Sequence, residues 1–205
     1  MYSKLQYISQ GNTLQEQQKN IQKALENGAD WIQIRWKNSM PDELFLLCKN
    51  ALVSCRKYNA VCVINDHIQI AKELDADGVH LGLNDDSIEK AKNILGDSKI
   101  IGGTANTISD VLKRIEEGCD YIGLGPFRFT TTKENLSPIL GLSGYGKIIQ
   151  YLKEHQTKVP PIYAIGGIEL QDLEAVKATG IYGIAVSGMI TQEPLNIQKI
   201  KEKLA

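Results

Sequence analysis

The sequence of 205 residues predicts an α/β fold, a (β/α)8 or TIM barrel of near-minimal length in which residues 1–205 form a single domain. Two observations indicate this fold. Eight short apolar segments with strand character alternate strictly with helical segments, and part of this unit recurs along the chain. The alternative is an open, doubly wound sheet, which normally carries a glycine-rich turn after its first strand. The turn Gln10-Gly11-Asn12 lacks that pattern, so the closed barrel is favoured.

The recurring unit is a helix stop, a short turn and a strand of mostly apolar residues. Its copies span residues 28–35, 75–82, 118–125 and, more loosely, 179–186. Glycine is favoured at a helix stop because the left-handed conformation found there penalises any Cβ. Strands that are apolar on both faces fit a sheet that packs against helices on one side and against itself on the other. Repetition in steps of two strands fits a barrel, whose interior layers are filled by alternate strands.

The remaining elements follow from hydrophobic periodicity and from helix-start signals. Each copy ends in a strand, and further strands are expected at residues 5–9, 61–65, 99–103 and 162–166. Helices are expected at residues 14–27, 41–58, 68–74, 87–95, 108–117, 145–155, 170–178 and 195–204. Pro41 suits a first helical turn, where its missing N–H costs nothing. Ser87 and Thr107 are placed to cap the helices that follow them.

Composition narrows the class of protein. The 23 basic and 24 acidic residues balance, so no global field draws the chain to nucleic acid or to a membrane surface. No apolar run reaches membrane-spanning length and residues 1–10 lack a signal-peptide pattern, so a cytoplasmic protein is expected. The four cysteines form no C-x-x-C pair and are interpreted as buried free thiols, with disulfides or metal ligands as the alternatives.

The most informative segment is the end of the second strand, where Gln33, Arg35 and Lys37 alternate with apolar residues. Side chains two apart on a strand share a face, so an amide, a guanidinium and an ammonium group can converge on one ligand. Arginine offers a planar fork to phosphate oxygens, and lysine offers a mobile point charge. The alternative is a solvated strand end with surface ion pairs. Glutamine and arginine inside an apolar strand pattern are costly unless a ligand or partner satisfies them, which favours a phosphate site.

Oxygen-bearing side chains follow the next two strands. Asn65 and Asp66 end the third strand, and Asp85 follows the fourth. Hard oxygen ligands from two loops suit Mg²⁺, which keeps several waters and shares the phosphates of a substrate. On the alternative interpretation, Asp66 and Asp85 are N-caps of the helices that follow them. Their place beside a cationic strand end favours a metal site with Mg²⁺ as the cofactor.

Three loops at the same end have phosphate-binding character. The connection from residue 125 to about residue 140 carries hydroxyls and a lysine, with a plain linker as the alternative. The loops after the seventh and eighth strands frequently bind phosphate in barrels through backbone N–H groups and a helix N-terminus. His80 is interpreted as a satisfied interior residue, and no spacing indicates a catalytic triad or a zinc site. The phosphate-binding candidates in these loops are Thr130, Thr132, Lys133, Gly166, Gly167, Ser187 and Gly188.

Taken in order, these motifs resemble those of the thiamine-phosphate synthase (thiamine-phosphate pyrophosphorylase) family and its thiazole tautomerase relatives. The similarity runs from about residue 7 to residue 190, nearly the whole chain. Any one motif is weak, but their order and spacing are specific. The segments that carry the similarity are residues 33–37, 64–66, 77–85, 120–126, 130–133, 164–168 and 183–187.

The resemblance implies a transferase of thiamine biosynthesis that joins hydroxymethylpyrimidine pyrophosphate to thiazole phosphate and releases pyrophosphate. By the same resemblance, the pyrimidine pyrophosphate would be held by Gln33, Arg35, Lys37, Asn65 and Lys133, and Mg²⁺ by Asp66 and Asp85. The thiazole phosphate would be held by Thr130, Thr132, Gly166, Gly167, Ser187 and Gly188. The implied catalytic residues are Arg35, Lys37, Lys133 and Thr104, which stands where the family usually has a serine. The partners implied are small phosphorylated molecules, and a homo-oligomer is compatible with the sequence.

Some residues depart from the family pattern, namely Trp36, Leu83, Asn106, Phe129 and Gly188. Thr104-Ala105-Asn106 stands where relatives often have Ser-x-His, and the tautomerase branch is characterised by a histidine near Asn106 that transfers a proton. An amide cannot act as a base near neutral pH, so a synthase is favoured over a tautomerase-like isomerase. The departures leave a further alternative, a non-catalytic regulator that binds thiazole phosphate or thiamine phosphate.

Overall fold

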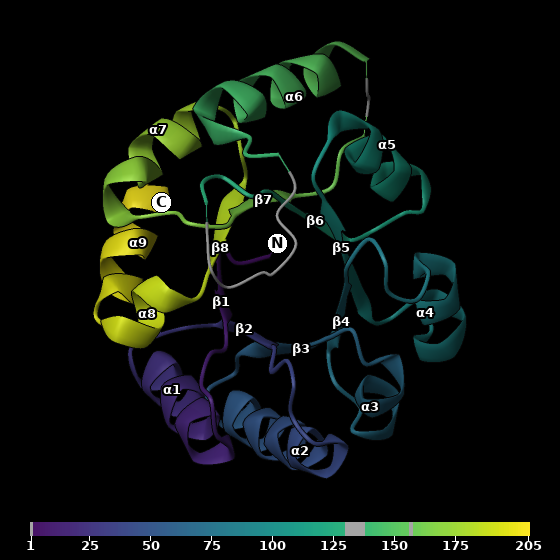
Figure 1. Cartoon of the computed structure of the whole chain (residues 1–205), viewed down its shortest axis with the longest axis vertical. Coiled ribbons are helices and arrows are strands. Elements are labelled where there is room, and N and C mark those ends of the chain that lie inside the picture. Colours follow the sequence, from purple (N-terminus) through teal and green to yellow (C-terminus); the bar gives the residue numbers. More distant parts are fainter. Residues whose placement is uncertain (1, 130–137, 156–157) are drawn as a thin grey trace.

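The computed structural model of the chain describes residues 2–129, 138–155 and 158–205. Eight strands form one closed barrel in the order β1 to β8, and each is parallel to both of its neighbours. The helices form a ring outside the strands (Figure 1). The predicted (β/α)8 barrel is therefore confirmed. Because all strands are parallel, their carboxyl ends open at one mouth, where the polar residues that follow the strands collect.

The elements alternate along the whole chain. The strands are β1 (Leu5–Ile8), β2 (Trp31–Ile34), β3 (Val61–Asn65), β4 (Gly78–Leu81), β5 (Ile100–Ala105), β6 (Tyr121–Leu124), β7 (Ile162–Ile165) and β8 (Gly183–Val186). The helices are α1 (Leu14–Glu26), α2 (Pro41–Lys57), α3 (Ile68–Glu73), α4 (Ile88–Leu95), α5 (Ile108–Glu116), α6 (Gly141–His155), α7 (Leu173–Ala178), α8 (Gly188–Gln192) and α9 (Asn196–Leu204). A short 3-10 helix, η1 (Leu170–Asp172), precedes α7.

Four elements differ from the expectation by two residues or more, and the others agree to within one residue where bounds were given. Helix α6 begins at Gly141 and not at Tyr145, because tertiary packing overrides the low helix propensity of the glycines in its first turns. Helix α8 has five residues, too few for a periodic signal, and was not expected. The helix expected at residues 170–178 is divided into η1 and α7. Strand β5 continues to Ala105 and so includes Thr104.

The two faces of most strands pack into different cores. Along β2, Ile32 and Ile34 belong to the large cluster between strands and helices, whereas Trp31 belongs to a smaller cluster inside the barrel. The Trp31 ring is 1% exposed, and its centroid lies 4.9 Å from that of Tyr121 and 5.4 Å from that of Tyr163. These rings stem from the first halves of β2, β6 and β7, so they fill the end of the barrel opposite the mouth. A ligand is therefore expected to enter from the carboxyl end.

The four cysteines are buried and free of disulfides, as predicted. Cys48 and Cys55 lie seven residues apart on the buried face of α2. Burial raises the pKa of the Cys48 and Cys119 thiols to about 12. These thiols stay protonated at neutral pH and pack as small apolar side chains.

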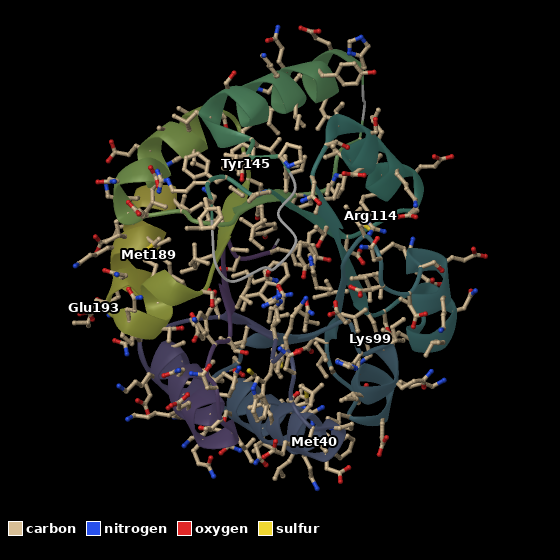
Figure 2. All side chains as sticks on the ribbon, in the orientation of Figure 1. Met40, Lys99, Arg114, Tyr145, Met189 and Glu193 are labelled. Carbon is tan, nitrogen blue, oxygen red and sulfur yellow. The ribbon has the colours of Figure 1, made fainter. Side chains whose placement is uncertain are left out.

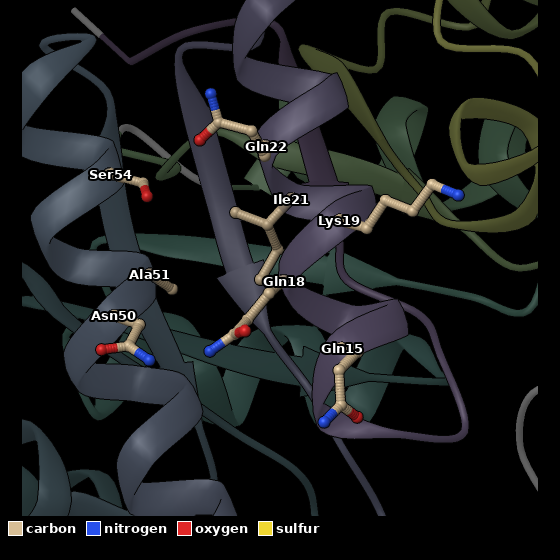
Figure 3. A pocket seen from close by; sticks show the side chains of 8 residues that line it. All are labelled: Gln15, Gln18, Lys19, Ile21, Gln22, Asn50, Ala51 and Ser54. Carbon is tan, nitrogen blue, oxygen red and sulfur yellow. The ribbon is translucent and has the colours of Figure 1, made fainter.

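Many polar and charged side chains lie on the outer surface of the helical ring (Figure 2). A hollow of about 450 Å³ lies between α1 and α2, and Gln18, Gln22 and Asn50 help to line it (Figure 3). All of its lining residues belong to these two helices, so it lies outside the barrel. Within the described ranges, no helix combines the length and the apolar character needed to cross a bilayer.

Helix α5 begins with a capping box, which confirms the predicted cap. Thr107 Oγ1 accepts a hydrogen bond from the Asp110 N–H at 3.1 Å, and Asp110 Oδ2 accepts one from the Thr107 N–H at 2.9 Å. We expect Thr107→Ala to lower the free energy of unfolding by about 1 kcal/mol, because one N–H of the first turn loses its acceptor. Urea unfolding measures the loss. Thr107→Ser keeps the hydroxyl and serves as the control, and an equal loss in that variant would contradict the capping role.

Candidate active site at the barrel mouth

The end of β2 brings an amide to the mouth. Gln33 is 2% exposed, and its Nε2 donates to Asn65 Oδ1 at 2.7 Å, which joins the ends of β2 and β3. Strand β2 ends at Ile34, so Arg35 and Lys37 lie in the turn that follows it. The prediction that Gln33, Arg35 and Lys37 share one face of a strand is therefore correct only in placing Gln33 on the strand; the other two residues reach the mouth from the turn. The Arg35 backbone N–H donates to Ser9 Oγ at 3.0 Å, which ties this turn to the end of β1.

Asp66 follows β3 in a strained backbone conformation. Its φ is +63°, in the left-handed region that few residues other than glycine adopt, although aspartate tolerates it. The His67 N–H donates to the Asn65 carbonyl at 2.8 Å, which makes a γ-turn centred on Asp66. The Asp66 N–H donates to the His80 carbonyl at 2.9 Å. Strain of this kind clusters at ligand sites, where the surrounding structure holds it in place.

Asp85 lies in the loop after β4, and neither acid caps a helix. Asp85 Oδ2 accepts a hydrogen bond from the Gly82 N–H at 2.6 Å. Ser87 caps α4 through the Lys90 N–H, as predicted, and the N-cap position of α3 is His67, which makes no side-chain cap bond. The interpretation of Asp66 and Asp85 as N-caps is therefore wrong.

The two acids interact with each other and with the cationic turn. Burial, a hydrogen bond with Asp85 and the charge of Asp85 raise the pKa of Asp66 to about 7. The charges of Lys37 and Arg35 oppose this rise. Burial also acts to raise the pKa of Asp85, but hydrogen bonds from Asp66 and the Gly82 N–H hold it below its ordinary value. Burial lowers the pKa of Arg35, and the charges of both carboxylates counteract that effect.

This arrangement fits a divalent cation. Two carboxyl groups this close repel each other unless a proton or a cation is shared between them, which is the cause of the raised Asp66 pKa. Within residues 2–129, 138–155 and 158–205, no group of three or more His, Cys, Asp or Glu side chains could hold a metal ion. A pair of carboxylates that leaves room for water and phosphate oxygens suits Mg²⁺, which demands no cage of protein ligands.

A chain of hydrogen bonds runs through the barrel interior to Thr104. Gln6 Nε2 donates to Tyr121 Oη at 3.1 Å, Tyr121 Oη lies 3.0 Å from His80 Nδ1, and His80 Nε2 lies 3.0 Å from Thr104 Oγ1. The network assigns the proton of Tyr121 to His80 Nδ1, so His80 Nε2–H donates to Thr104. His80 is 5% exposed, which confirms it as a satisfied interior histidine.

The loop after β7 depends on its two glycines. Gly166 and Gly167 have φ values of +92° and +69°. A Cβ on Gly167 would lie 2.9 Å from the Phe129 carbonyl oxygen, so both backbone conformation and close approach require glycine. The Arg128 N–H donates to the Gly166 carbonyl at 3.0 Å, and Arg128 Nη1 donates to the Gly167 carbonyl at 2.8 Å. Arg128 also forms a two-pronged ion pair with Asp172 at 2.8 and 3.0 Å. The loop is therefore held rigidly at the mouth.

The loop after β8 lies beside the end of β1. Ser187 Oγ donates to Gln10 Oε1 at 3.2 Å, and Gly188 begins α8. Thr130, Thr132 and Lys133 lie outside the described residues, so their predicted roles stay predictions. The start of their loop is attached to β7 by a hydrogen bond from the Phe127 N–H to the Ile165 carbonyl at 2.8 Å.

Asn106 has a structural role beside the mouth. It is 5% exposed, and its Nδ2 donates to the carbonyl oxygens of Ala105 and Gly125. These contacts join the ends of β5 and β6. The Asn106 amide thus braces the backbone at the ends of these two strands.

Several residues at the site were missed in the sequence. Arg114 and Arg128 each bind the backbone of a candidate site residue, and Tyr121 bonds His80, which in turn bonds Thr104. The only signals were an arginine within the apolar stripe of α5 and a tyrosine at the start of a buried strand. Neither signal predicts which residue the side chain contacts, because the contacts join residues far apart in the chain.

Comparison with known proteins agrees with this geometry. A family model described as thiamine monophosphate synthase matches residues 5–190. Thiamine-phosphate synthase of Flavobacterium psychrophilum is 57% identical over 202 residues, which are 98% of this chain and 98% of the relative. Thiamine-phosphate synthase of Flavobacterium johnsoniae is 55% identical over 207 residues, covering 100% of this chain and 97% of the relative. The structure of thiamine phosphate pyrophosphorylase from Pyrococcus furiosus superimposes with a TM-score of 0.82 at 31% identity, covering 98% of this chain and 96% of that one.

Proposed function

Because the chain belongs to the thiamine monophosphate synthase family, we propose that it is a transferase that joins hydroxymethylpyrimidine pyrophosphate to thiazole phosphate. The products are thiamine phosphate and pyrophosphate. The observation that carries the proposal is that the charges of both Asp66 and Asp85 act on the Arg35 guanidinium at the barrel mouth. A cationic fork beside a pair of carboxylates is the arrangement that a polyphosphate and its metal ion require.

The pyrophosphate subsite lies over the ends of β2 to β5. Arg35 and Lys37 supply positive charge, and Asn65, held by Gln33, supplies an amide edge. Asp66 and Asp85 would hold Mg²⁺, which neutralises part of the charge of the pyrophosphate. The Thr104 hydroxyl, which accepts from His80, has its own proton to donate to the leaving group. Lys133 completes this subsite in the proposal.

The thiazole phosphate occupies the opposite side of the mouth. Backbone N–H groups of the loops at Gly166-Gly167 and Ser187-Gly188 bind its phosphate, as loops after the last two strands of such barrels do. The rigid hold of Arg128 on the Gly167 carbonyl supports this role, because a preformed loop loses little entropy on binding. Thr130 and Thr132 add hydroxyl contacts in the proposal.

The reaction is a substitution at the methylene carbon of the pyrimidine. The carbon–oxygen bond breaks, and its electron pair leaves with the pyrophosphate, whose growing charge Arg35 and Lys37 stabilise. The electron-rich pyrimidine ring delocalises the positive charge left on the carbon. The thiazole nitrogen then forms the new carbon–nitrogen bond. No strong base takes part, so fixed charge and the positioning of both substrates provide the acceleration.

The decisive test is product formation. Purified protein is incubated with both substrates and Mg²⁺, and thiamine phosphate and pyrophosphate are measured; omission of either substrate or addition of a metal chelator is the control. We expect both products in equal amounts and only in the complete mixture. Binding of thiazole phosphate without turnover would favour the regulator instead, and proton exchange on the thiazole carboxylate phosphate would favour a tautomerase. The proposal also includes a cytoplasmic location, where phosphorylated substrates of this kind are available.

A further inference from the structure

Arg114 is a buried arginine behind the candidate active site. It lies on α5, is only 3% exposed, and extends from the helix toward the strands (Figure 2). A buried guanidinium is costly unless it is paired and fully hydrogen-bonded. A helix that covers a barrel needs only apolar residues on its inner face, so packing alone does not explain this arginine.

Its guanidinium spans the ends of two neighbouring strands. Nε donates to the Thr104 carbonyl at 3.0 Å, and Nη2 donates to the Gly82 carbonyl at 2.9 Å. Nη1 forms an ion pair with Glu117 at 2.8 Å, which balances the charge. The last paired residues of β4 and β5 are Leu81 and Gly103, so both carbonyls lie one residue beyond the ladder. The planar fork therefore continues the link between the two strands past the point where their own hydrogen bonds end.

Both carbonyls belong to residues that hold a functional group. The Gly82 N–H binds Asp85 Oδ2 at 2.6 Å, and the Thr104 hydroxyl receives a hydrogen bond from His80 at 3.0 Å. A single guanidinium thus connects the backbone beneath a proposed metal ligand with the backbone beneath a proposed leaving-group donor. A change in its position would move the two groups relative to each other.

The two glycines of β5 make room for this arrangement. A Cβ on Gly103 would lie 2.7 Å from Arg114 Cδ and 2.8 Å from its Nε. A Cβ on Gly102, which faces the barrel interior, would collide with the ring of Tyr121. Large polar side chains therefore approach β5 closely from both sides, Arg114 from outside and Tyr121 from inside. Arg114 holds the Thr104 carbonyl, and Tyr121 holds the Thr104 hydroxyl through His80.

We propose that Arg114 is a positioning residue that sets the distance between Asp85 and the Thr104 hydroxyl. The inference rests on the proposed function, since these two groups matter only if a metal-bound pyrophosphate lies between them. Arg114 acts from behind the strands, through Gly82 and Thr104. Lysine cannot replace it, because a single ammonium group cannot reproduce a fork that binds two separated carbonyls.

The test measures the binding of pyrophosphate in the presence of Mg²⁺ by calorimetry, together with kcat and KM. The variants are Arg114→Lys, which retains the charge, and Arg114→Ala, which leaves space for added guanidinium ion. Lys113→Met is the matched control, because Lys113 is the adjacent cation on α5, lies 3.8 Å from the same Glu117 and is 65% exposed. Urea unfolding of each variant shows how much of it is folded.

We expect folded Arg114→Lys to bind magnesium pyrophosphate about 10-fold more weakly, which is the size of loss seen when a residue that orients a metal ligand is replaced. We expect kcat to fall by a similar factor. Guanidinium ion, below concentrations that unfold the protein, should restore binding in Arg114→Ala, whereas Lys113→Met should resemble the unchanged protein. Binding within twofold of the unchanged protein in folded Arg114→Lys, with no rescue of Arg114→Ala, would overturn the inference and leave Arg114 a purely structural residue. If the unchanged protein itself binds no magnesium pyrophosphate, the proposed active site fails, and the inference fails with it.

Discussion

Arg35→Ala is expected to lower kcat/KM for the synthase reaction by about 10²-fold or more. The charges of Asp66 and Asp85, which would hold the metal, act on the Arg35 guanidinium, so in the proposal it stabilises the charge that the leaving pyrophosphate gains. Removal of one charge-assisted contact of this kind costs on the order of 2–3 kcal/mol in the transition state. Steady-state kinetics with each substrate varied in turn measure the loss, which should fall mostly on kcat because the charge develops as the bond breaks.

Two further variants make the Arg35 result specific. Arg35→Lys keeps the charge but lacks the fork, so an intermediate rate is expected. Arg56→Ala is the matched control: Arg56 lies on α2, is 61% exposed and pairs with Asp75 at 4.0 Å. A near-normal rate in Arg35→Ala, or an equal loss in Arg56→Ala, would remove Arg35 from the leaving-group subsite.

Asp66→Asn is expected to have an effect of similar or greater size, about 10²–10³-fold on kcat/KM. Asp66 and Asp85 interact directly, and together they would hold the Mg²⁺ that balances the pyrophosphate. The loss should be partly recovered at high Mg²⁺ concentration, because an amide oxygen still binds the ion, only more weakly. A titration of activity against Mg²⁺, together with calorimetric binding of Mn²⁺, measures both effects.

The stability of the Asp66→Asn variant shows whether its loss of activity comes from unfolding. Without metal, two adjacent carboxyl groups oppose each other, so replacement of one by an amide relieves repulsion. The metal-free variant is expected to resist urea at least as well as the unchanged protein at pH 8. Asp86→Asn is the control, since Asp86 is 43% exposed and pairs with Lys90 at 2.7 Å on the surface. A variant that loses activity only because it unfolds, or that keeps its full response to Mg²⁺, would refute the metal-ligand role.

Local patterns in the sequence were sufficient to predict most of the helices and strands. The helix stops and apolar strands of the recurring unit predicted the eightfold alternation, and Thr107 was predicted as a cap that the structure contains. These features depend on neighbours only a few residues away, which a single sequence displays. The start of α6 and the whole of α8 were missed, because packing decides short or glycine-rich helices more than propensity does.

Part of the candidate site could also be predicted from the sequence, and part could not. Residues that end strands, such as Gln33 and Asp66, could be predicted because a parallel barrel brings all strand ends to one mouth. The capping interpretation of Asp66 and Asp85 is rejected by the structure, which places the N-cap of α3 at His67 and confirms the predicted cap Ser87 for α4.

By itself, the sequence of this protein determined the barrel and the chemical character of its mouth, because both arise from periodic patterns of apolar residues and from side chains at their ends. Only the tertiary structure decided how those side chains are held. The fork of Arg114 across two strands and the chain from Gln6 to Thr104 join residues distant in sequence, and hydrogen bonds of this length depend on separations that folding alone establishes.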